Sequence, residues 1–395
     1  MHLPSPALTL FAWLIAFAWL YKLLEAARGL ATVPNLLAPE YDVAPAGNPS
    51  LTVVVPARNE AEDIAACLES LLHQDYANLR IVAVDDRSTD ATGTIIETLA
   101  RAHCDRLEVL SVMELPANWL GKTHAMALAA RFAIETYQPE YLLFTDADIL
   151  FRPDALRRAL ALAVATQADH FVLLPTTLVK TRGEGMLLSF LQVMSMWAIR
   201  VWRVADPKAK RDALGVGAFN LIRTPVYQQL GGFDAAAMEI IEDLELGRRV
   251  KLAGFRQCAA TGPGLVCVHW AAGARGIVTG MTKNLFAVFR FRIELLLAAA
   301  AGMVLFCIAP VAFLALPGTR AAGLLTVVSA AGLYALSSRT SRISPVYALT
   351  LPIAAAVVVY SMLRSMGITL FRGGVTWRGT FYPLKDLREH AKRRT

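Results

Sequence analysis

Long apolar stretches near both ends of the chain limit the folds that this sequence can adopt. They cover residues 7–28, about 293–318, 321–338 and 344–366. Each has close to the ~20 residues that a helix needs to cross the hydrocarbon core of a membrane. Residues between them mix charged and apolar types as a water-soluble domain does. We therefore expect a globular domain at 50–270, an N-terminal transmembrane anchor at 1–30, and a C-terminal transmembrane region at 293–366 with two to three helices.

The composition and the first apolar stretch indicate a membrane protein. The 395 residues are 55% hydrophobic, and the mean hydropathy is +0.45, which is too apolar for a purely soluble chain. The first stretch differs from a secretory signal peptide because no basic residue precedes it and no small-residue cleavage site ends it. Lys22 and Arg28 lie at its end, which places the following domain in the cytoplasm by the positive-inside rule. We expect a multi-pass protein of the cell inner (cytoplasmic) membrane.

Charge and cysteine usage exclude two other classes. The net charge is +7, but the basic residues collect near the apolar segments and form no stripe with interleaved aromatics. Attraction to anionic lipid headgroups explains this pattern, so we expect no nucleic-acid partner. The five cysteines show no CxxC or paired spacing. They fit a reducing compartment and argue against a structural zinc site.

The central segment alternates short apolar runs with stretches of helical spacing. Strands are expected at 52–55, 81–84, 107–110, 141–145 and 170–174, and helices at 60–73, 90–103, 123–137 and 153–167. Pro153 stands where the last of these helices would begin. Such alternation predicts an α/β fold, Rossmann-like, with a mostly parallel sheet covered by helices on both faces.

Acidic residues stand where two of these strands end. Asp85 and Asp86 follow the second strand, and Asp146 and Asp148 follow the fourth, with no lysine or arginine beside the latter pair. Ligands bind beyond the carboxyl ends of such strands. Carboxylates there suit Mg²⁺ or Mn²⁺ carrying a diphosphate. The alternative is that aspartates after strands shape turns or cap the next helix, as Asp90 could do.

A third acidic cluster lies further along the chain. Glu239, Glu242, Asp243 and Glu245 begin an amphipathic helix that ends at Gly254. Acids are also favoured at a helix N-terminus by its dipole alone. The functional interpretation is that one carboxylate points into the cleft as a general base, with Asp243 the first candidate and Glu242 the second.

Six segments in order resemble the successive motifs of family 2 glycosyltransferases, which have the GT-A fold. They read VVVPARNE, VAVDDRSTDAT, WLGKTHAMALAA, FTDADI, GAFNLIRTPVYQQLGGFD and IEDLELGRRVKLAGF, within residues 50–270. The arrangement of the membrane segments is similar to that of the ceramide glucosyltransferase and hopanoid-associated branches. The amino-acid sequences of the motifs, together with VTWRGTFYPL at 375–384, most resemble those of the hopanoid-biosynthesis-associated enzymes.

The resemblance implies roles for individual residues. The substrate-binding set would be Pro56, Arg58, Glu60, Asp85, Asp86, Lys122 and Asp146. Asp86 would contact the nucleotide base, and Lys122 would balance phosphate charge. Asp148, helped by Asp146, would hold the metal, and Asp243 would take the proton of the acceptor hydroxyl. Enzymes of this type invert the anomeric centre.

One motif of many membrane relatives, Q-x-x-R-W after the catalytic base, is missing. The corresponding region reads GARGIVTGMTKNLFAVFRFR at 273–292, in which Arg275, Lys283 and Arg290 are the candidate cations. This argues against a processive polysaccharide synthase.

Two segments outside the expected spans predict contact with the membrane surface. Residues 186–204 carry Trp197, Arg200, Trp202 and Arg203 near one end, as an interfacial amphipathic helix would. Residues 277–292 are a second such segment. A spanning helix or an ordinary buried helix is the alternative for 186–204. Interfacial helices beside the cleft would let a lipid acceptor enter from the membrane.

The sequence leaves the number of C-terminal crossings open. Three crossings would put the basic tail at 367–395 outside the cell, against the positive-inside tendency. The short segment 321–338, rich in Ala, Gly and Ser, could instead be re-entrant.

The acidic motifs, together with what the resemblance implies, predict an inverting, metal-dependent hexosyltransferase. It would move a sugar from a nucleotide-sugar donor, expected to be a UDP-sugar, to a membrane lipid such as a hopanoid or sphingolipid-like acceptor. The alternatives are a polyprenyl-phosphate sugar synthase and a non-catalytic membrane scaffold with a GT-A fold. Turnover of a nucleotide sugar by the purified protein would separate the enzymes from the scaffold.

Overall fold

Two parts of the chain form separate units in the computed structural model, which describes residues 5–392. The sheet unit comprises Val33–Leu178 and Val201–His269. The helical unit comprises residues 5–32, Val179–Arg200 and residues 270–392. The domain predicted at 50–270 thus corresponds to the sheet unit, except that residues 179–200 belong to the helical unit.

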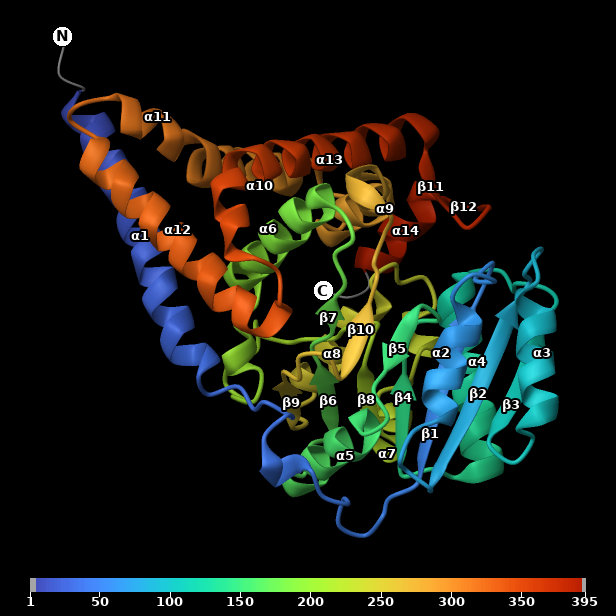
Figure 1. Cartoon of the computed structure of the whole chain (residues 1–395). Helices are drawn as coiled ribbons and strands as arrows, with labels where there is room; N and C mark the ends of the chain where they lie inside the picture. Colours follow the sequence, from blue (N-terminus) through green and yellow to red (C-terminus); the bar gives the residue numbers. More distant parts are fainter. Residues whose placement is uncertain (1–4, 393–395) are drawn as a thin grey trace. The chain divides into compact units, whose positions relative to one another are not determined.

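A seven-stranded sheet forms the centre of the sheet unit (Figure 1). Its strands are β1 (Leu51–Ala57), β2 (Leu79–Asp86), β3 (Leu107–Val112), β4 (Tyr141–Phe144), β6 (His170–Leu173), β8 (Asn220–Arg223) and β9 (Gln257–Ala260). They lie in the order β3-β2-β1-β4-β8-β6-β9. Only β8 runs antiparallel to its neighbours, β4 and β6. The predicted α/β fold with a mostly parallel sheet is confirmed.

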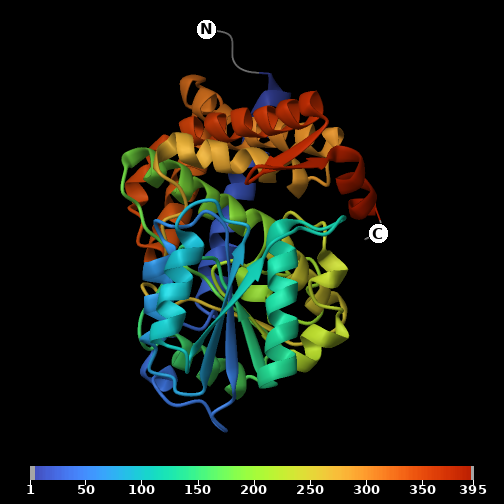
Figure 2. The ribbon, with the colours of Figure 1, turned by 90° about the vertical axis from the view of Figure 1, so that its right-hand side faces the viewer.

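Helices cover both faces of this sheet, because successive strand side chains point to opposite sides. The helices are α2 (Ile64–Leu72), α3 (Thr92–Ala102), α4 (Gly121–Tyr137), α5 (Ala155–Ala165), α7 (Thr224–Gln229) and α8 (Glu242–Leu252). Val53 and Val55 of β1 pack in one core cluster with α2, α3 and α5. Val54 packs in the other cluster with α4, α7 and α8. Figure 2 shows the blue strands between α2 and α3 on one side and α4 on the other.

The segment after Asp148 differs from the sequence prediction. Ile149–Phe151 forms a short strand, β5, which joins β10 (Val266–Val268) and β7 (Thr176–Thr177) in a second sheet. Pro153 was predicted to begin a helix, but α5 begins at Ala155. The Pro153 carbonyl accepts the Asp75 N–H at 2.8 Å, which holds the proline in the turn between β5 and α5.

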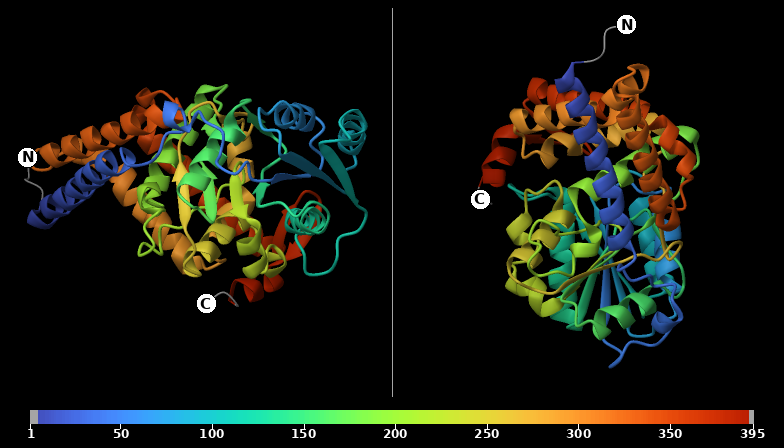
Figure 3. Two further views of the ribbon diagram at one scale, coloured as in Figure 1. Left: turned by 90° about the horizontal axis from the view of Figure 1, so that it is seen from below. Right: turned by 90° about the vertical axis from the view of Figure 1, so that its left-hand side faces the viewer.

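The helical unit contains the long apolar segments. Its helices are α1 (Pro6–Leu30), α6 (Arg182–Ala198), α9 (Gly273–Val288), α10 (Ile293–Met303), α11 (Ala309–Ala315), α12 (Arg320–Ser341), α13 (Leu351–Arg372) and α14 (Leu384–Lys392). A hairpin of β11 (Gly374–Trp377) and β12 (Thr380–Pro383) follows α13. Within this unit α1 and α12 run side by side (Figures 1 and 3).

Five helical segments among the described residues are long and apolar enough to cross a membrane. They are Pro6–Leu30, Arg182–Arg203, Ile293–Ala315, Arg320–Ser341 and Pro345–Arg372. Four of them match the apolar stretches of the sequence. The segment predicted as short and open to a re-entrant course is one continuous 22-residue helix, α12. Three C-terminal segments are therefore long enough to span.

The helix predicted to lie on the membrane surface at 186–204 is α6 with the turn that follows it. The segment Arg182–Arg203 is also long and apolar enough to cross a membrane. The ring centre of Trp197 lies 5.4 Å from the ring centre of Trp19 on α1. Arg200 Nη1 lies 3.6 Å from Glu25 Oε1, also on α1. These two residues, predicted as membrane-surface anchors, pack against another helix.

A π-helical turn, Val304–Ile308, joins α10 to α11. Pro310 in α11 has no N–H to donate to the carbonyl one turn earlier, which is a common cause of such irregularity. That carbonyl, of Phe306, instead accepts the indole N–H of Trp19 at 2.9 Å. The apolar segment 293–318 is thus tied to α1 by a hydrogen bond that satisfies a backbone acceptor.

The structure corrects the prediction that residues 367–395 form only a basic tail. Residues 367–372 complete α13, and the hairpin and α14 follow it. Arg378 and Gly379, both with positive φ, form the two-residue turn that a tight hairpin favours. Arg393 and Arg394, predicted as part of the tail, lie outside the described residues.

Candidate active site

The carboxyl ends of β2, β1 and β4 bring the predicted site residues to one edge of the sheet. β1 lies between β2 and β4 and runs parallel to both. The chain order reverses across β1 and β4, which is where open α/β sheets bind ligands. Glu60 follows β1, Asp86 ends β2, and Asp148 follows β4. The structure therefore places these acidic residues at the carboxyl ends of neighbouring parallel strands, as the strand pattern predicted.

Lys122 links two of the acidic clusters. Its Nζ lies 2.5 Å from Asp146 Oδ1 and 2.6 Å from Glu242 Oε1. Burial lowers the pKa of Lys122, but the two carboxylates outweigh it and raise the pKa well above its usual value. The sequence interpretation that no cation stands beside Asp146 and Asp148 is wrong, because α4 begins at Gly121 and brings Lys122 to the end of β4.

Asp148, unlike Asp146 and Glu242, does not contact the Lys122 ammonium. Among the described residues it forms no ion pair with a lysine or arginine. Burial, with the nearby charges of Asp146 and Glu60, raises the pKa of Asp148 to about 7. A divalent cation would supply the missing positive charge, and Asp146 and Asp148 offer the hard oxygen donors that Mg²⁺ and Mn²⁺ prefer.

This donor set is small. No group of three or more His, Cys, Asp or Glu side chains forms a ready metal site in the part of the chain that the structure describes. A cation held by two carboxylates would complete its coordination with water and substrate phosphate, as Mg²⁺ usually does. The residues fit a metal that binds together with a diphosphate.

Asp243 lies in the first turn of α8 and is partly buried. Its Oδ2 accepts the Gly217 N–H at 2.7 Å, and its Oδ1 accepts the Leu244 N–H at 2.7 Å. Burial and the neighbouring Glu242 raise the pKa of Asp243 to about 7, against the lowering effect of Lys122. A carboxylate with this pKa can accept a proton near neutral pH. Glu242 is already paired with Lys122, which makes Asp243 the better candidate base.

Two glycines that the sequence interpretation did not single out position these acids. A Cβ on Gly217 would lie 2.6 Å from Asp146 Oδ2, and the Gly217 N–H holds Asp243. A Cβ on Gly215 would lie 1.7 Å from the Asp243 carbonyl oxygen. The chain therefore passes too close to both carboxylate-bearing segments for any side chain. The G-x-G spacing within 215–217 was the available signal.

A buried polar network lies behind Asp243 and was also missed. His170 is 0% exposed, with Nε2 bonded to Asn220 Oδ1 and Nδ1 accepting from Gln257 Nε2 at 2.8 Å. Asn220 Nδ2 donates to the Asp243 carbonyl at 3.4 Å. Burial lowers the pKa of His170 to about 4, so this histidine is neutral. The network fixes the start of α8 relative to β6 and β8.

Asp86 is buried and held by arginines. Arg87 Nε and Nη2 donate to its two oxygens at 2.7 and 3.0 Å, and Arg58 Nη1 lies 4.0 Å away. A Cβ on Gly121 would lie 2.4 Å from Asp86 Oδ2. Asp86, predicted to contact a nucleotide base, thus lies beside the start of α4, next to Lys122.

The other residues predicted for the nucleoside pocket occupy the adjoining loops. Pro56 is buried in β1, and the Glu60 N–H donates to Thr92 Oγ1 at 2.8 Å. Asp85 Oδ1 accepts the Ser88 N–H at 3.2 Å. Asp90 accepts the Thr92 N–H at 3.0 Å before α3 begins. Asp85 and Asp90 therefore shape the loop. This is the turn-forming role that was the alternative to ligand binding for aspartates after strands.

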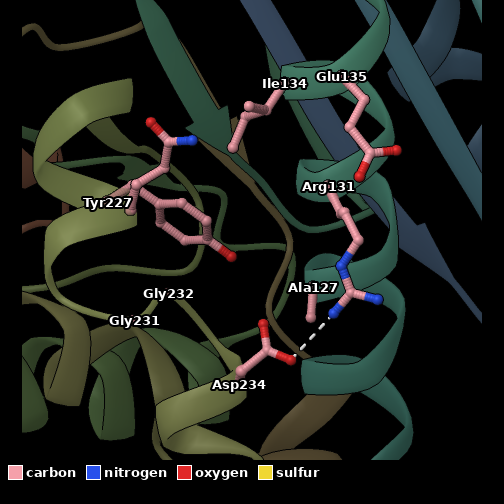
Figure 4. A pocket seen from close by; sticks show the side chains of 9 residues that line it. Ala127, Arg131, Ile134, Glu135, Tyr227, Gly231, Gly232 and Asp234 are labelled. Carbon is pink, nitrogen blue, oxygen red and sulfur yellow. Dashed lines mark hydrogen bonds and ion pairs between the residues drawn. The ribbon is translucent and has the colours of Figure 1, made fainter.

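A separate cavity of about 320 Å³ lies between α4 and the segment 227–234 (Figure 4). Arg131 and Asp234 face each other across it, with Nη2 and Oδ1 3.1 Å apart. Both side chains are more than half exposed, so this pair is worth little energetically. The cavity contains none of the acidic residues predicted for the site.

Comparison with known proteins agrees with the motifs. Residues 52–206 match the family model of glycosyl transferase family 2. The 4,4'-diaponeurosporenoate glycosyltransferase of Staphylococcus haemolyticus is 25% identical over 60% of this chain and 61% of that protein. The Staphylococcus aureus protein of the same name is 25% identical over 60% of both chains. The chain thus spans about three fifths of the length of these relatives.

The fold also recurs in a solved structure. A mannosyltransferase from Pyrobaculum calidifontis, in complex with GDP-Man and Mn²⁺, covers 91% of this chain and 99% of its own at a TM-score of 0.54 and 22% identity. This likeness concerns the fold. Residues 52–206 thus resemble glycosyl transferase family 2 in sequence, and the mostly parallel sheet of the sheet unit has the Rossmann-like GT-A fold.

Proposed function

We propose that this chain is an inverting, metal-dependent glycosyltransferase that moves a sugar from a nucleoside-diphosphate donor to a membrane lipid. The observation that carries the proposal is the meeting of two acidic segments, 146–148 and 242–243, around Lys122. Asp146 and Glu242 both contact its Nζ, and Gly217 joins Asp146 to Asp243. A scaffold would not need four carboxylates gathered around one lysine, since burying charge is costly.

The chemistry assigns one role to each part of the cluster. Asp243 accepts the proton of the acceptor hydroxyl while that oxygen forms a bond to the anomeric carbon. The bond from this carbon to the diphosphate breaks on the opposite side, so the configuration inverts and no covalent intermediate is needed. Lys122 provides positive charge near the departing diphosphate. A divalent cation bound by Asp146 and Asp148 would add charge at the same group.

The donor side would be formed by the loops after β1 and β2. Pro56, Arg58, Glu60, Asp85 and Asp86 are the proposed nucleoside-binding residues. Because Arg87 neutralises Asp86, a base that hydrogen-bonds to Asp86 would have to share this carboxylate with the guanidinium. We keep a UDP-sugar as the first donor to test and a GDP-sugar as the second, since the solved mannosyltransferase of this fold was captured with GDP-Man and Mn²⁺.

The acceptor is proposed to be a lipid, which two observations support. Five segments of the described chain are long and apolar enough to span a membrane, and the curated relatives are named for transfer to diaponeurosporenoate. We propose the inner membrane as the location, with the sheet unit in the cytoplasm where nucleotide sugars are made. A hopanoid or sphingolipid-like acceptor remains the specific candidate.

Ligand-induced stabilisation tests the donor part of the proposal. The full chain in detergent would be heated with each nucleotide sugar, with Mn²⁺ or with EDTA. Binding at 100 times Kd stabilises a protein by about 2.7 kcal/mol, so one donor should raise the Tm clearly and only with the metal. No rise with any nucleotide sugar, in the presence of Mn²⁺, would contradict the proposal.

A further inference from the structure

A second cavity, of about 240 Å³, lies wholly within the helical unit. It is lined by α9, the last turns of α13 and the strand β11, which neighbour one another in Figure 1. The residues of its lining that carry polar groups include Thr279, Thr282, Lys283, Arg364, Arg372 and Thr376. None of this cavity belongs to the cluster around Lys122.

The charged side chains that line this cavity are all basic. Lys283, Arg364 and Arg372 contribute three positive charges, and none of the ten lining residues, all within the described chain, is acidic. Among the described residues, Arg364 and Arg372 have no carboxylate partner. Like charges gathered around one cavity repel one another unless an anion enters. The lining therefore favours a negatively charged occupant.

The cavity is held in shape by defined contacts. The Ser365 hydroxyl on α13 donates to the Thr282 carbonyl at 2.5 Å and accepts the Phe286 N–H at 3.1 Å. The Arg364 guanidinium donates to the hydroxyl of Thr282. The two helices are thus joined by side-chain hydrogen bonds at the level of the cavity. Arg364 is directed at α9 and does not extend away from the protein.

The hairpin closes the other side. Gly373, with φ of +67°, ends α13 in the left-handed conformation that lets the chain turn back. The Lys283 ammonium then lies 4.0 Å from the centre of the Trp377 ring, a contact that orients the cation. Of the cations considered from the sequence in this region, Lys283 lines the cavity, while Arg275 and Arg290 do not.

General attraction to headgroups is the simpler explanation for basic residues at the end of a membrane segment. Arg372 alone would fit it, since it lies in the last turn of α13 as Arg339 lies in the last turn of α12. General attraction to headgroups does not account for Arg364, which lies two turns earlier and is hydrogen-bonded across to α9. It also does not account for a cavity with threonine residues among the cations of its lining.

We propose that this cavity binds an oxyanion of the phosphate type, supplied by a lipid headgroup or by a free phosphate. Arg presents a fork of N–H donors that matches phosphate oxygens, and Lys adds a point charge. The cavity lies at the end of the candidate span Pro345–Arg372, the depth at which lipid phosphates occur. The inference is independent of sugar transfer, because the binding would occur without a donor.

The test uses the full chain in an uncharged detergent and measures the Tm. Three probes are added in turn: inorganic phosphate, a short-chain phosphatidic acid, and the diacylglycerol of the same chain length, which lacks the phosphate. Phosphatidic acid should raise the Tm and diacylglycerol should not. A rise with phosphatidic acid alone identifies a lipid headgroup as the source, and an additional rise with inorganic phosphate shows that a free anion is also accepted.

Variants separate a built site from diffuse charge. Arg364→Gln and Lys283→Met should weaken binding of phosphatidic acid by about tenfold or more, since each removes a charge-assisted hydrogen bond. Arg372→Gln, at an exposed position, gives the same test in a variant that should fold normally. Arg339→Gln is the matched control and should bind as the wild type does.

Four results would overturn the proposal. The first is an equal rise in Tm with diacylglycerol and phosphatidic acid. The second is unchanged affinity in both Arg364→Gln and Arg372→Gln. The third is an equal loss in Arg339→Gln and Arg372→Gln, which would mean that only the general charge of the helix ends is sensed. No rise with any of the probes would also reject it.

Discussion

The ammonium of Lys122 lies 2.5 Å from the same Asp146 carboxylate that would have to bind a metal ion. A metal ion held by Asp146 would therefore compete with Lys122 when no nucleotide is present. With a metal ion and a diphosphate in the site, Lys122 would be able to pair with a phosphate oxygen instead. One counter-charge would then replace another, and Asp146 would not be left uncompensated.

Lys122→Met tests this competition. Without the lysine, Asp146 and Asp148 should bind Mn²⁺ more tightly in the absence of nucleotide, by about tenfold or about 1.4 kcal/mol. Affinity for a nucleoside diphosphate in the presence of Mn²⁺ should fall. Calorimetry measures both quantities. Arg131→Met, on the same helix but outside the cluster, is the control and should change neither, and an unchanged Mn²⁺ affinity in Lys122→Met would contradict the competition.

Asp148→Asn should abolish the metal-dependent part of nucleotide binding. The substitution keeps the size of the side chain but removes the charge that the cation would neutralise. Titration of a nucleoside diphosphate with and without Mn²⁺ is the measurement. If wild type and variant showed the same dependence on the metal, Asp148 would not be a metal ligand.

Asp243→Asn should keep nucleotide affinity and lose turnover by about 10²–10⁴-fold, the usual effect of removing a general base. Because burial raises the pKa of Asp243 to about 7, the wild-type rate should rise as the pH increases through about 7, where the carboxylate becomes deprotonated. The residual rate of the variant should lack this rise. Loss of nucleotide binding in proportion to turnover would instead favour Glu242 as the base.

Gly215→Ala should damage the site through the backbone. Its Cβ would meet the Asp243 carbonyl oxygen at 1.7 Å, so the first turn of α8 has to move, at a cost of about 1–3 kcal/mol. We expect a lower Tm and reduced turnover. Gly302→Ala, where nothing lies within 4 Å of the added carbon, is the matched control. Wild-type activity in Gly215→Ala would show that the position of α8 is not critical.

His170 predicts a pH dependence of stability. Its pKa of about 4 in the folded protein lies below the ordinary value of 6.5, because burial disfavours the charged form. Its contribution is complete above pH 6.5 and is lost as the pH falls toward 4, by about 3 kcal/mol in all. The Tm of the wild type should therefore fall more over this range than that of His170→Gln. Parallel curves for the two proteins would show that His170 is not buried neutral.

The sequence predicted the sheet and the position of its acids because strand and helix periods are local properties. Asp86 and Asp148 could be placed at one edge since parallel strands end together. The contact between Lys122 and Asp146 could not be predicted, because it depends on how α4 begins relative to the end of β4. The short strand β5 and the close approach at Gly217 were missed for the same reason, since each is set by tertiary contacts.

Transfer of a labelled sugar into lipid tests the central claim most directly. The full chain would be incubated with a radiolabelled nucleotide sugar and membrane lipid, and label would be counted in the organic phase. The account predicts label in the lipid fraction with Mn²⁺, its loss with EDTA, and its loss in Asp243→Asn while Asp234→Asn, outside the cluster, remains active. Label in the lipid fraction that persists in EDTA and in Asp243→Asn would contradict a metal-dependent transfer by this site.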